Sequence, residues 1–152
     1  DEGDPKSAFD KAINNSNKVS MSLSDLFCVE RHKFEFLNLV KNKLDITFAN
    51  EQEITSLIDA KNFTEVINFV KELKKTIIIT RGEKGSVAIN KGMVTECESK
   101  KNLKILDLTG AGDLFAAGYL HGYINNLTVQ ESLEKGTEMS SKIIQQIGAR
   151  LF

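Results

Sequence analysis

Residues 107–113 read Asp-Leu-Thr-Gly-Ala-Gly-Asp, and this run joins two apolar segments of different length. Leu103–Leu106 before it predicts a short strand, and residues 111–124 after it predict a helix. Gly110 and Gly112 leave the backbone N–H groups uncovered at the helix start, where the helix dipole adds about half a positive charge. The run is therefore typical of a strand–loop–helix unit whose turn binds an anion.

Helices and strands alternate on the N-terminal side of this unit. Three consecutive isoleucines in Thr76–Thr80 predict a strand that is buried on both faces of a parallel sheet. The alternation predicts an α/β layered fold with a mostly parallel sheet, formed by residues 1–152 as one domain. The remaining expected elements are helices at 5–15 and 51–58, helical stripes through Phe34, Leu37 and Val40 and along 63–73, strands at 19–23, 44–49, 87–89 and 93–97, and a last helix from Thr128 that includes Ile147 and ends at Gly148.

Composition and charge exclude several classes of function. The formal net charge is -1, which offers no attraction to nucleic acid or to an anionic membrane. No apolar run approaches the roughly 20 residues that a membrane span needs. The acidic residues 1–4 do not resemble a signal peptide, and the two cysteines lack the spacing of a zinc site. We therefore expect a cytoplasmic protein that binds small molecules.

Asp113 is the unexpected member of the glycine run. A carboxylate beside a bound phosphate is repelled, so its presence favours a role in proton transfer, such as accepting the proton of an attacking hydroxyl. The alternative is that Asp113 only caps the helix and that the glycines only permit a tight turn. A dinucleotide-binding turn is disfavoured because Phe115 occupies the third glycine position of that motif.

Two further loops follow predicted strands. Asn50 and Glu53 come directly after one strand, and amide and carboxylate oxygens suit Mg²⁺. The same pair also fits a helix N-cap with its partner at the third helical position. Thr80–Gly85 follows the isoleucine strand, with a hydroxyl and two glycines that can hold nucleotide phosphates, or that simply form a turn. The carboxyl ends of parallel strands meet at one edge of a sheet, so we expect all three loops to lie close together.

The three loops together resemble the ribokinase-like, or PfkB, family of carbohydrate and nucleoside kinases. The resemblance lies in an N-x-x-E motif (Asn50, Glu53), a T-x-G-x-x-G loop (Thr80, Gly82, Gly85) and the D-T-x-G-A-G-D loop with Asp113 as its last residue. Within that family the chain is most similar to adenosine kinases, in residues 23–27, 44–51 and 143–149. The resemblance implies the C-terminal portion of a ribokinase-like three-layer fold.

The resemblance also implies a reaction and a role for each site residue. ATP would phosphorylate a primary hydroxyl of a nucleoside or a sugar, with Asp113 as the general base and the N–H groups of Gly110, Ala111 and Gly112 around the transferring phosphoryl group. Thr80, Gly82, Gly85, Asn50 and Thr137 would bind the nucleotide, although Thr137 fits a core-flanking position equally well. Glu53 would orient Mg²⁺. Asp107 matches a residue that binds a monovalent cation such as K⁺ in some relatives.

Two departures from the family pattern limit these expectations. Leu108 occupies a position where a small residue is usual, which puts the monovalent cation in doubt. Family members are about twice as long as this chain, and their N-terminal half supplies most contacts to the acceptor. We therefore expect the 152-residue chain alone to be inactive. We also expect that it can form a homodimer through its uncovered sheet edge. A non-catalytic nucleotide-binding fragment remains the alternative from another class.

Overall fold

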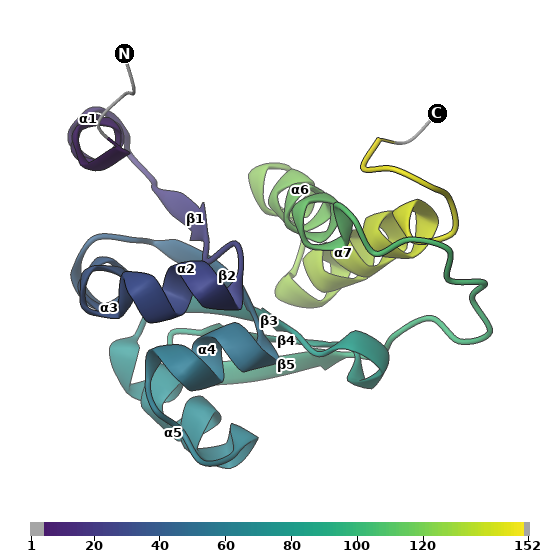
Figure 1. Ribbon diagram of the computed structural model, residues 1–152, viewed down its shortest axis with the longest axis horizontal. Coiled ribbons are helices and arrows are strands. Elements are labelled where there is room, and N and C mark those ends of the chain that lie inside the picture. The colour runs from purple at the N-terminus through teal and green to yellow at the C-terminus, as the bar shows by residue number, and fades with distance from the viewer. Residues whose placement is uncertain (1–4, 151–152) are drawn as a thin grey trace.

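The isoleucine run forms the centre of a five-stranded sheet in the computed structural model, which describes residues 5–150 (Figure 1). The acidic residues 1–4 used for the localisation prediction lie outside that range. The strand order is β1-β2-β3-β4-β5. The strands are β1 (Ser20–Ser22), β2 (Ile46–Asn50), β3 (Thr76–Thr80), β4 (Ser86–Asn90) and β5 (Met93–Cys97).

Four of the five strands run in the same direction. β1, β2 and β3 pair in parallel, while β4 is antiparallel to both β3 and β5. A tight turn at Lys91 and Gly92 joins β4 to β5, so these two strands form a hairpin next to the parallel part. The sheet is therefore mixed and mostly parallel, in agreement with the expected α/β class.

Side chains on the two faces of the sheet belong to two separate hydrophobic cores. Ile77 and Ile79 of β3 belong to one buried cluster, and Ile78 belongs to the other. Because successive side chains of a strand point to opposite faces, the run of three isoleucines supplies both layers. The first cluster is covered by α2 (Leu26–Arg31), α3 (Lys33–Asn42), α4 (Glu51–Leu57) and α5 (Phe63–Leu73), and the second by α6 (Ala111–Ile124) and α7 (Val129–Ile143).

This arrangement is a three-layer α/β/α fold. Figure 1 shows α6 and α7 side by side on one side of the sheet and α2 to α5 on the other, with α1 (Pro5–Asn15) beyond the start of β1. Close contacts fix α6 against α7. A Cβ atom added at Gly118 would lie 2.5 Å from the carbonyl oxygen of Lys135, so only glycine permits this approach.

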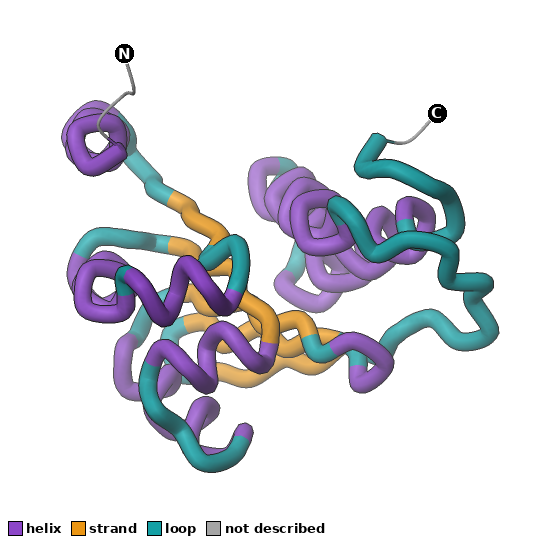
Figure 2. The backbone as a smooth tube through the Cα atoms, viewed as in Figure 1, coloured by secondary structure: helices purple, strands orange, loops and turns teal. Residues whose placement is uncertain are grey.

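The predicted strand at Leu103–Leu106 is wrong. These residues lie in the long loop that connects β5 to α6 (Figure 2). A strand requires a neighbouring strand for its backbone groups, and the N–H of Leu106 instead donates to the carbonyl of Ile144, after α7, at 2.8 Å. Ile105 is 53% exposed, so within the described residues its side chain is not buried as that of a core strand would be.

The expected ends and faces of two helices also need correction. α7 ends at Ile143 instead of continuing to Gly148, and Ile147 is 79% exposed. The N–H of Gln145 bonds to Lys142 and that of Gln146 to Ile143, so the helix tightens and stops after Ile143. In α3 only Val40 of the predicted stripe is fully buried, whereas Phe34 is 82% exposed because it faces away from the sheet.

Candidate active site

Two parallel strands bring the first two predicted loops to one edge of the sheet. Asn50 ends β2, Thr80 ends β3, and the two residues are direct partners in the parallel register. A cavity of about 300 Å³ opens above them, and the start of α6 forms its opposite wall. The predicted site residues that line this cavity are Asn50, Glu53, Thr80, Gly110, Ala111, Gly112 and Asp113. The expectation that the loops converge is confirmed for these residues.

Gly110 shapes the turn at the start of α6. It is the N-cap residue, with φ of 77° in the left-handed region, and an added Cβ atom would lie 3.0 Å from the Cβ of Ala149. A side chain at this position would meet both backbone strain and a steric conflict. Glycine is therefore required here by the fold itself, before any ligand is considered.

The backbone N–H groups of the turn are not equally available. The N–H of Ala111 donates to the carbonyl of Leu108 at 3.2 Å, which closes the turn. Within residues 5–150, no hydrogen-bond partner is found for the N–H groups of Gly110, Gly112 and Asp113. No atom lies within 4 Å of a Cβ added at Gly112, so the approach to these donors is open. An anion fits this cradle through Gly110, Gly112 and Asp113 better than through Ala111.

Asp113 occupies the third position of α6 and its side chain is exposed at the cavity. A carboxylate in the first turn of a helix is stabilised by the helix dipole, so a purely structural role would also place an acidic residue here. No other carboxylate of the described chain lines the cavity except that of Glu53. A general base must reach the hydroxyl from which it takes the proton, so a place at the cavity wall is the position such a role requires.

Asn50 and Glu53 form a complete capping box on α4. The Asn50 side chain accepts from the N–H of Glu53 at 2.8 Å, and the Glu53 carboxylate accepts from both the backbone N–H and the side-chain amide of Asn50, at 2.9 and 2.7 Å. Burial, opposed by the backbone hydrogen bond, raises the pKa of Glu53, and the nearby charge of Asp25 raises it further. A buried carboxylate of this kind gains from a cation, so the pair fits Mg²⁺ as well as its capping role.

The loop after β3 contributes to two different places. Thr80 lines both the small cavity and a second, larger one beside it, and Gly82 lines only the larger one. Gly85 has φ of 85°, and a Cβ atom there would lie only 2.1 Å from the carbonyl oxygen of Cys97. The need for glycine at position 85 therefore comes from the close approach of the backbone at the end of β5, which pairs with β4, and a nucleotide is not required to explain it.

Thr137 and Asp107 lie outside the cavity. Thr137 is buried on α7, with its Oγ1 3.6 Å from the Sγ of Cys97, which is the core-flanking environment of the alternative interpretation. Asp107 accepts hydrogen bonds from Thr109 and from the N–H of Gly148. In residues 5–150 no three acidic, histidine or cysteine side chains are grouped as metal ligands, and the monovalent cation stays a prediction.

Two serines in the loop after β1 belong to the cavity although they were not predicted as site residues. Ser22 and Ser24 line the cavity opposite the start of α6. Ser24 has φ of 70°, a strained value for a residue with a side chain, and its N–H donates to the hydroxyl of Ser22 at 3.3 Å. The available signal was their place directly after the first parallel strand, at the same edge as Asn50 and Thr80.

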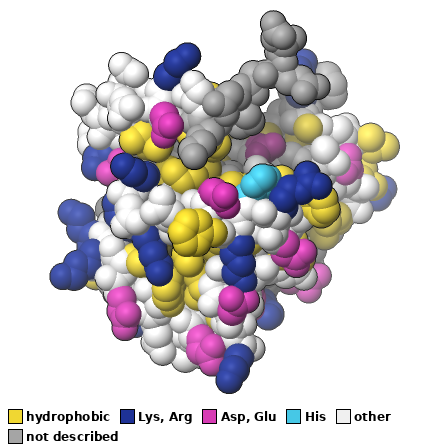
Figure 3. All heavy atoms as spheres, turned by 60° about the vertical axis from the view of Figure 1, so that its left-hand side comes forward, with side chains coloured by type: hydrophobic (Ala, Val, Ile, Leu, Met, Phe, Trp, Pro, Cys, Tyr) yellow, Lys and Arg dark blue, Asp and Glu magenta, His cyan; other side chains and the backbone are white. Residues whose placement is uncertain are grey.

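Positive and negative side chains are interspersed on the face seen in Figure 3. The whole sequence carries 20 basic and 21 acidic residues, so its net charge supplies no broad attraction for nucleic acid. Among the helices described for residues 5–150, none combines the length and the apolar character that crossing a bilayer demands.

Comparison with known proteins adds a family and several relatives. The profile of the pfkB family carbohydrate kinases matches residues 7–152. The cytidine kinase of Thermococcus kodakarensis is 32% identical over 119 residues, which cover 75% of this chain and 42% of that protein.

Two solved structures superpose closely on the chain. The adenosine kinase from Sinorhizobium meliloti is 33% identical with a TM-score of 0.93, over 99% of this chain and 48% of that one. A probable sugar kinase from Rhizobium etli CFN 42 is 35% identical with a TM-score of 0.87, over 95% of this chain and 44% of that one. The chain thus spans about half the length of these relatives.

Proposed function

Because the chain belongs to the pfkB family of carbohydrate kinases, we propose that its cavity transfers a phosphoryl group from ATP to a primary hydroxyl of a nucleoside. The observation that carries the proposal is the placement of Asp113 beside the free N–H groups of Gly110 and Gly112 in one cavity with Asn50 and Glu53. The family membership and the fold, which is ribokinase-like with a mixed, mostly parallel sheet, agree with the sequence-based expectations.

In the proposed reaction Asp113 accepts the proton of the acceptor hydroxyl. The hydroxyl oxygen then forms a bond to the γ-phosphorus of ATP while the bond to the bridging oxygen breaks, and ADP leaves. The N–H groups of Gly110, Gly112 and Asp113 stabilise the charge on the transferring group, with the dipole of α6 behind them. Because these donors are fixed by the turn, they need no rearrangement during the transfer.

The remaining predicted residues hold and orient the phosphoryl donor. Thr80 offers a hydroxyl at the cavity floor, and Gly82 and Gly85 shape the loop above it. Asn50 and Glu53 supply the oxygen atoms for Mg²⁺, which would neutralise phosphate charge when bound. Thr137 is retained only as a prediction for the nucleotide, because its side chain is buried against Cys97.

A nucleoside is proposed as acceptor because the cytidine kinase and the adenosine kinase above are similar over most of this chain. The second candidate is the same chemistry on a sugar, which the similarity to the probable sugar kinase favours. The alternative from another class is a nucleotide-binding protein without turnover. All three concern the complete protein, since the chain spans about half the length of its relatives.

A panel of acceptors tests the proposal. The complete protein is incubated with Mg·ATP and with adenosine, cytidine, ribose or fructose, and the release of ADP is followed together with ³¹P NMR of the product. We expect one nucleoside to exceed both sugars in kcat/KM by about tenfold or more. A sugar that reacts faster overturns the choice of acceptor. ATP binding without any phosphorylated product would favour the non-catalytic alternative.

A further inference from the structure

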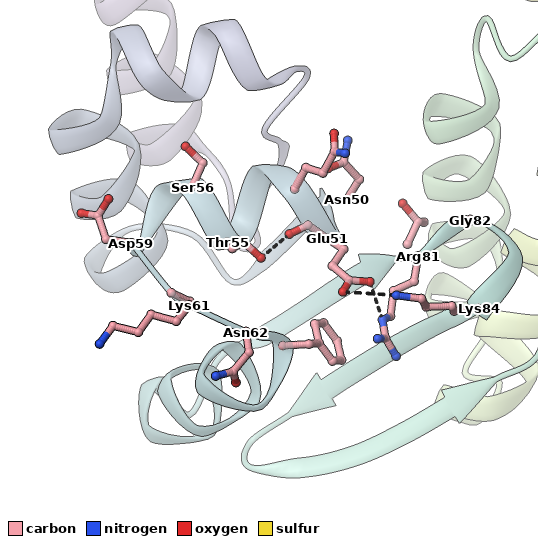
Figure 4. Close-up of a pocket in the computed structure, with 14 residues that line it drawn as sticks. Asn50, Glu51, Thr55, Ser56, Asp59, Lys61, Asn62, Arg81, Gly82 and Lys84 are labelled. Carbon is pink, nitrogen blue, oxygen red and sulfur yellow. Dashed lines mark hydrogen bonds and ion pairs between the residues drawn. The ribbon is translucent and has the colours of Figure 1, made fainter.

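Arg81 connects the loop after β3 to the start of α4. Its Nε donates to Oε2 of Glu51 at 2.9 Å, and the Nζ of Lys84 lies 3.8 Å from the other oxygen of the same carboxylate. Figure 4 shows both basic side chains converging on Glu51. The carboxylate of Glu51 therefore binds the residue before the short turn Gly82–Lys84 and the last residue of that turn.

The guanidinium group of Arg81 is also stacked on an aromatic ring. Its central carbon lies 3.6 Å from the ring centroid of Phe63, the first residue of α5. The Arg81 side chain is only 18% exposed, so water screens its charge less than that of a surface residue. A planar guanidinium can stack on a ring while it donates a hydrogen bond, a geometry that the point charge of an ammonium group does not reproduce. The arrangement therefore favours arginine over lysine.

The loop itself is closed by its own backbone. The N–H of Arg81 donates to the carbonyl of Gly85 at 2.8 Å, and the N–H of Gly85 donates to that of Gly82 at 3.0 Å. On the side away from α4, the hydroxyl of Ser99 donates to the carbonyl of Glu83 at 2.7 Å. Strand pairing holds Thr80 and Ser86 at the two ends of the loop, so the contacts of Arg81 and Lys84 with Glu51 fix the part of the loop that projects beyond the sheet.

Close packing does not hold the loop against α4. A cavity of about 860 Å³ separates the loop from the outer side of α4 and the start of α5, and Arg81, Lys84 and Glu51 all line it. This cavity and the smaller one share Asn50 and Thr80. Without the contacts of Arg81, this space would allow the turn Gly82–Lys84 to move relative to α4.

We propose that Arg81 is a positioning residue that fixes the nucleotide loop 80–85 against the Asn50/Glu53 pair. Glu51 stands between Asn50 and Glu53 in the sequence, so the bond from Arg81 joins the predicted phosphate loop to the helix start that carries the predicted magnesium ligands. The inference rests on the proposed function. It adds a residue that touches neither ATP nor the acceptor and acts through the two groups that do.

The test compares Arg81→Met, Glu51→Gln and the double variant in the complete protein. Each single change removes the same ion pair, so each should raise KM for Mg·ATP by about five- to tenfold with kcat little changed. The double variant should show no greater rise than Arg81→Met alone, because the pair is already broken. The dissociation constant of the non-hydrolysable analogue Mg·AMPPNP, measured by calorimetry, should rise by the same factor.

Lys18→Met is the matched control. Lys18 precedes β1 and pairs at 2.9 Å with Asp45, which precedes β2. This ion pair lies at the end of the strands away from the cavity, so its loss should leave the KM for the nucleotide unchanged. If the Arg81 and Glu51 variants keep the wild-type KM and dissociation constant, the inference is overturned. The proposed function still stands in that case, provided that the wild-type protein phosphorylates a nucleoside. A weakened analogue in a protein that phosphorylates no acceptor would support the positioning role and contradict the proposed function. A wild-type protein that binds no nucleotide would contradict both.

Discussion

The Asp107 carboxylate accepts a hydrogen bond from the backbone N–H of Gly148 at 2.9 Å, across 41 positions of sequence. Its other oxygen accepts from the N–H and the hydroxyl of Thr109, at 2.9 and 2.7 Å. Asp107 therefore connects the segment after α7 to the turn that begins α6. The shape of the turn at the start of α6 therefore depends on residues that follow the last helix, and not only on its glycines.

Asp107 should make stability depend on pH in the acid range. The hydrogen bond from Gly148, followed by those from Thr109, lowers the pKa of Asp107 from 3.8 to about 2. A carboxylate whose folded-state pKa is lowered stabilises the fold above its unfolded pKa and loses that contribution as the pH falls toward the folded value. Asp107→Asn should therefore melt at a lower temperature than wild type at pH 7, and the difference should shrink between pH 4 and pH 2. A difference that stays constant over this range would show that the carboxylate charge is unimportant.

Glu53→Gln should separate magnesium binding from helix capping. Glutamine serves at the third position of a capping box, so α4 should keep its stability. A neutral amide holds a hard cation less well, so the Mg²⁺ concentration for half-maximal rate in the complete protein should rise. The matched control is Glu131→Gln, which changes the same position of the capping box on α7. If both variants give the wild-type magnesium curve, Glu53 has only a capping role.

Gly112→Ala should damage phosphoryl transfer without destabilising the fold. Gly112 lies within α6 and nothing occupies the space of an added Cβ, so alanine should be stabilising by about 0.5–1 kcal/mol, as the better helix former. The new methyl group would crowd the donors that face the phosphate, and kcat should fall. Gly110→Ala is the contrasting variant, since it meets Ala149 and should lower the melting temperature. Wild-type turnover in Gly112→Ala would mean that no phosphate approaches this turn.

The 152-residue chain by itself should be inactive and should self-associate. In the described residues β1 is an edge strand that pairs only with β2, and both Ser20 and Ser22 are exposed. An uncovered edge offers unpaired backbone groups to a second copy. Sedimentation velocity should detect dimers that Ser20→Lys reduces. A monomer that phosphorylates adenosine at the rate of the complete protein would contradict both expectations.

Local patterns predicted most of the fold. The isoleucine run of β3, the limits of α6, the capping pair of Asn50 and Glu53 and the start of the last helix at Thr128 follow from residue type and spacing, and the structure confirms them. The wrong predictions are those that depend on a neighbouring segment. Leu103–Leu106 has the composition of a strand, but no strand lies beside it, and Phe34 falls on a helical stripe that the sheet does not reach.

The site was predictable where it depends on topology. Residues that follow parallel strands meet at one edge, which brought Asn50 and Thr80 together as expected. The start of α6 lines the same cavity, although the strand predicted before it is absent from the described residues. The contacts of Arg81 could not be predicted, because sequence spacing does not record that its side chain meets Phe63 and Glu51. The assignment of individual catalytic roles remains a prediction.

The kcat of Asp113→Asn in the complete protein tests the central claim most directly. Asparagine keeps the shape and the helix-start position of Asp113 but cannot accept the proton, so kcat should fall by about 10²–10⁴ while the melting temperature changes little. The matched control is Glu35→Gln, an exposed acidic residue at the same position in the first turn of α3, which should keep wild-type turnover. Turnover of Asp113→Asn within a few-fold of wild type would show that Asp113 is not the general base.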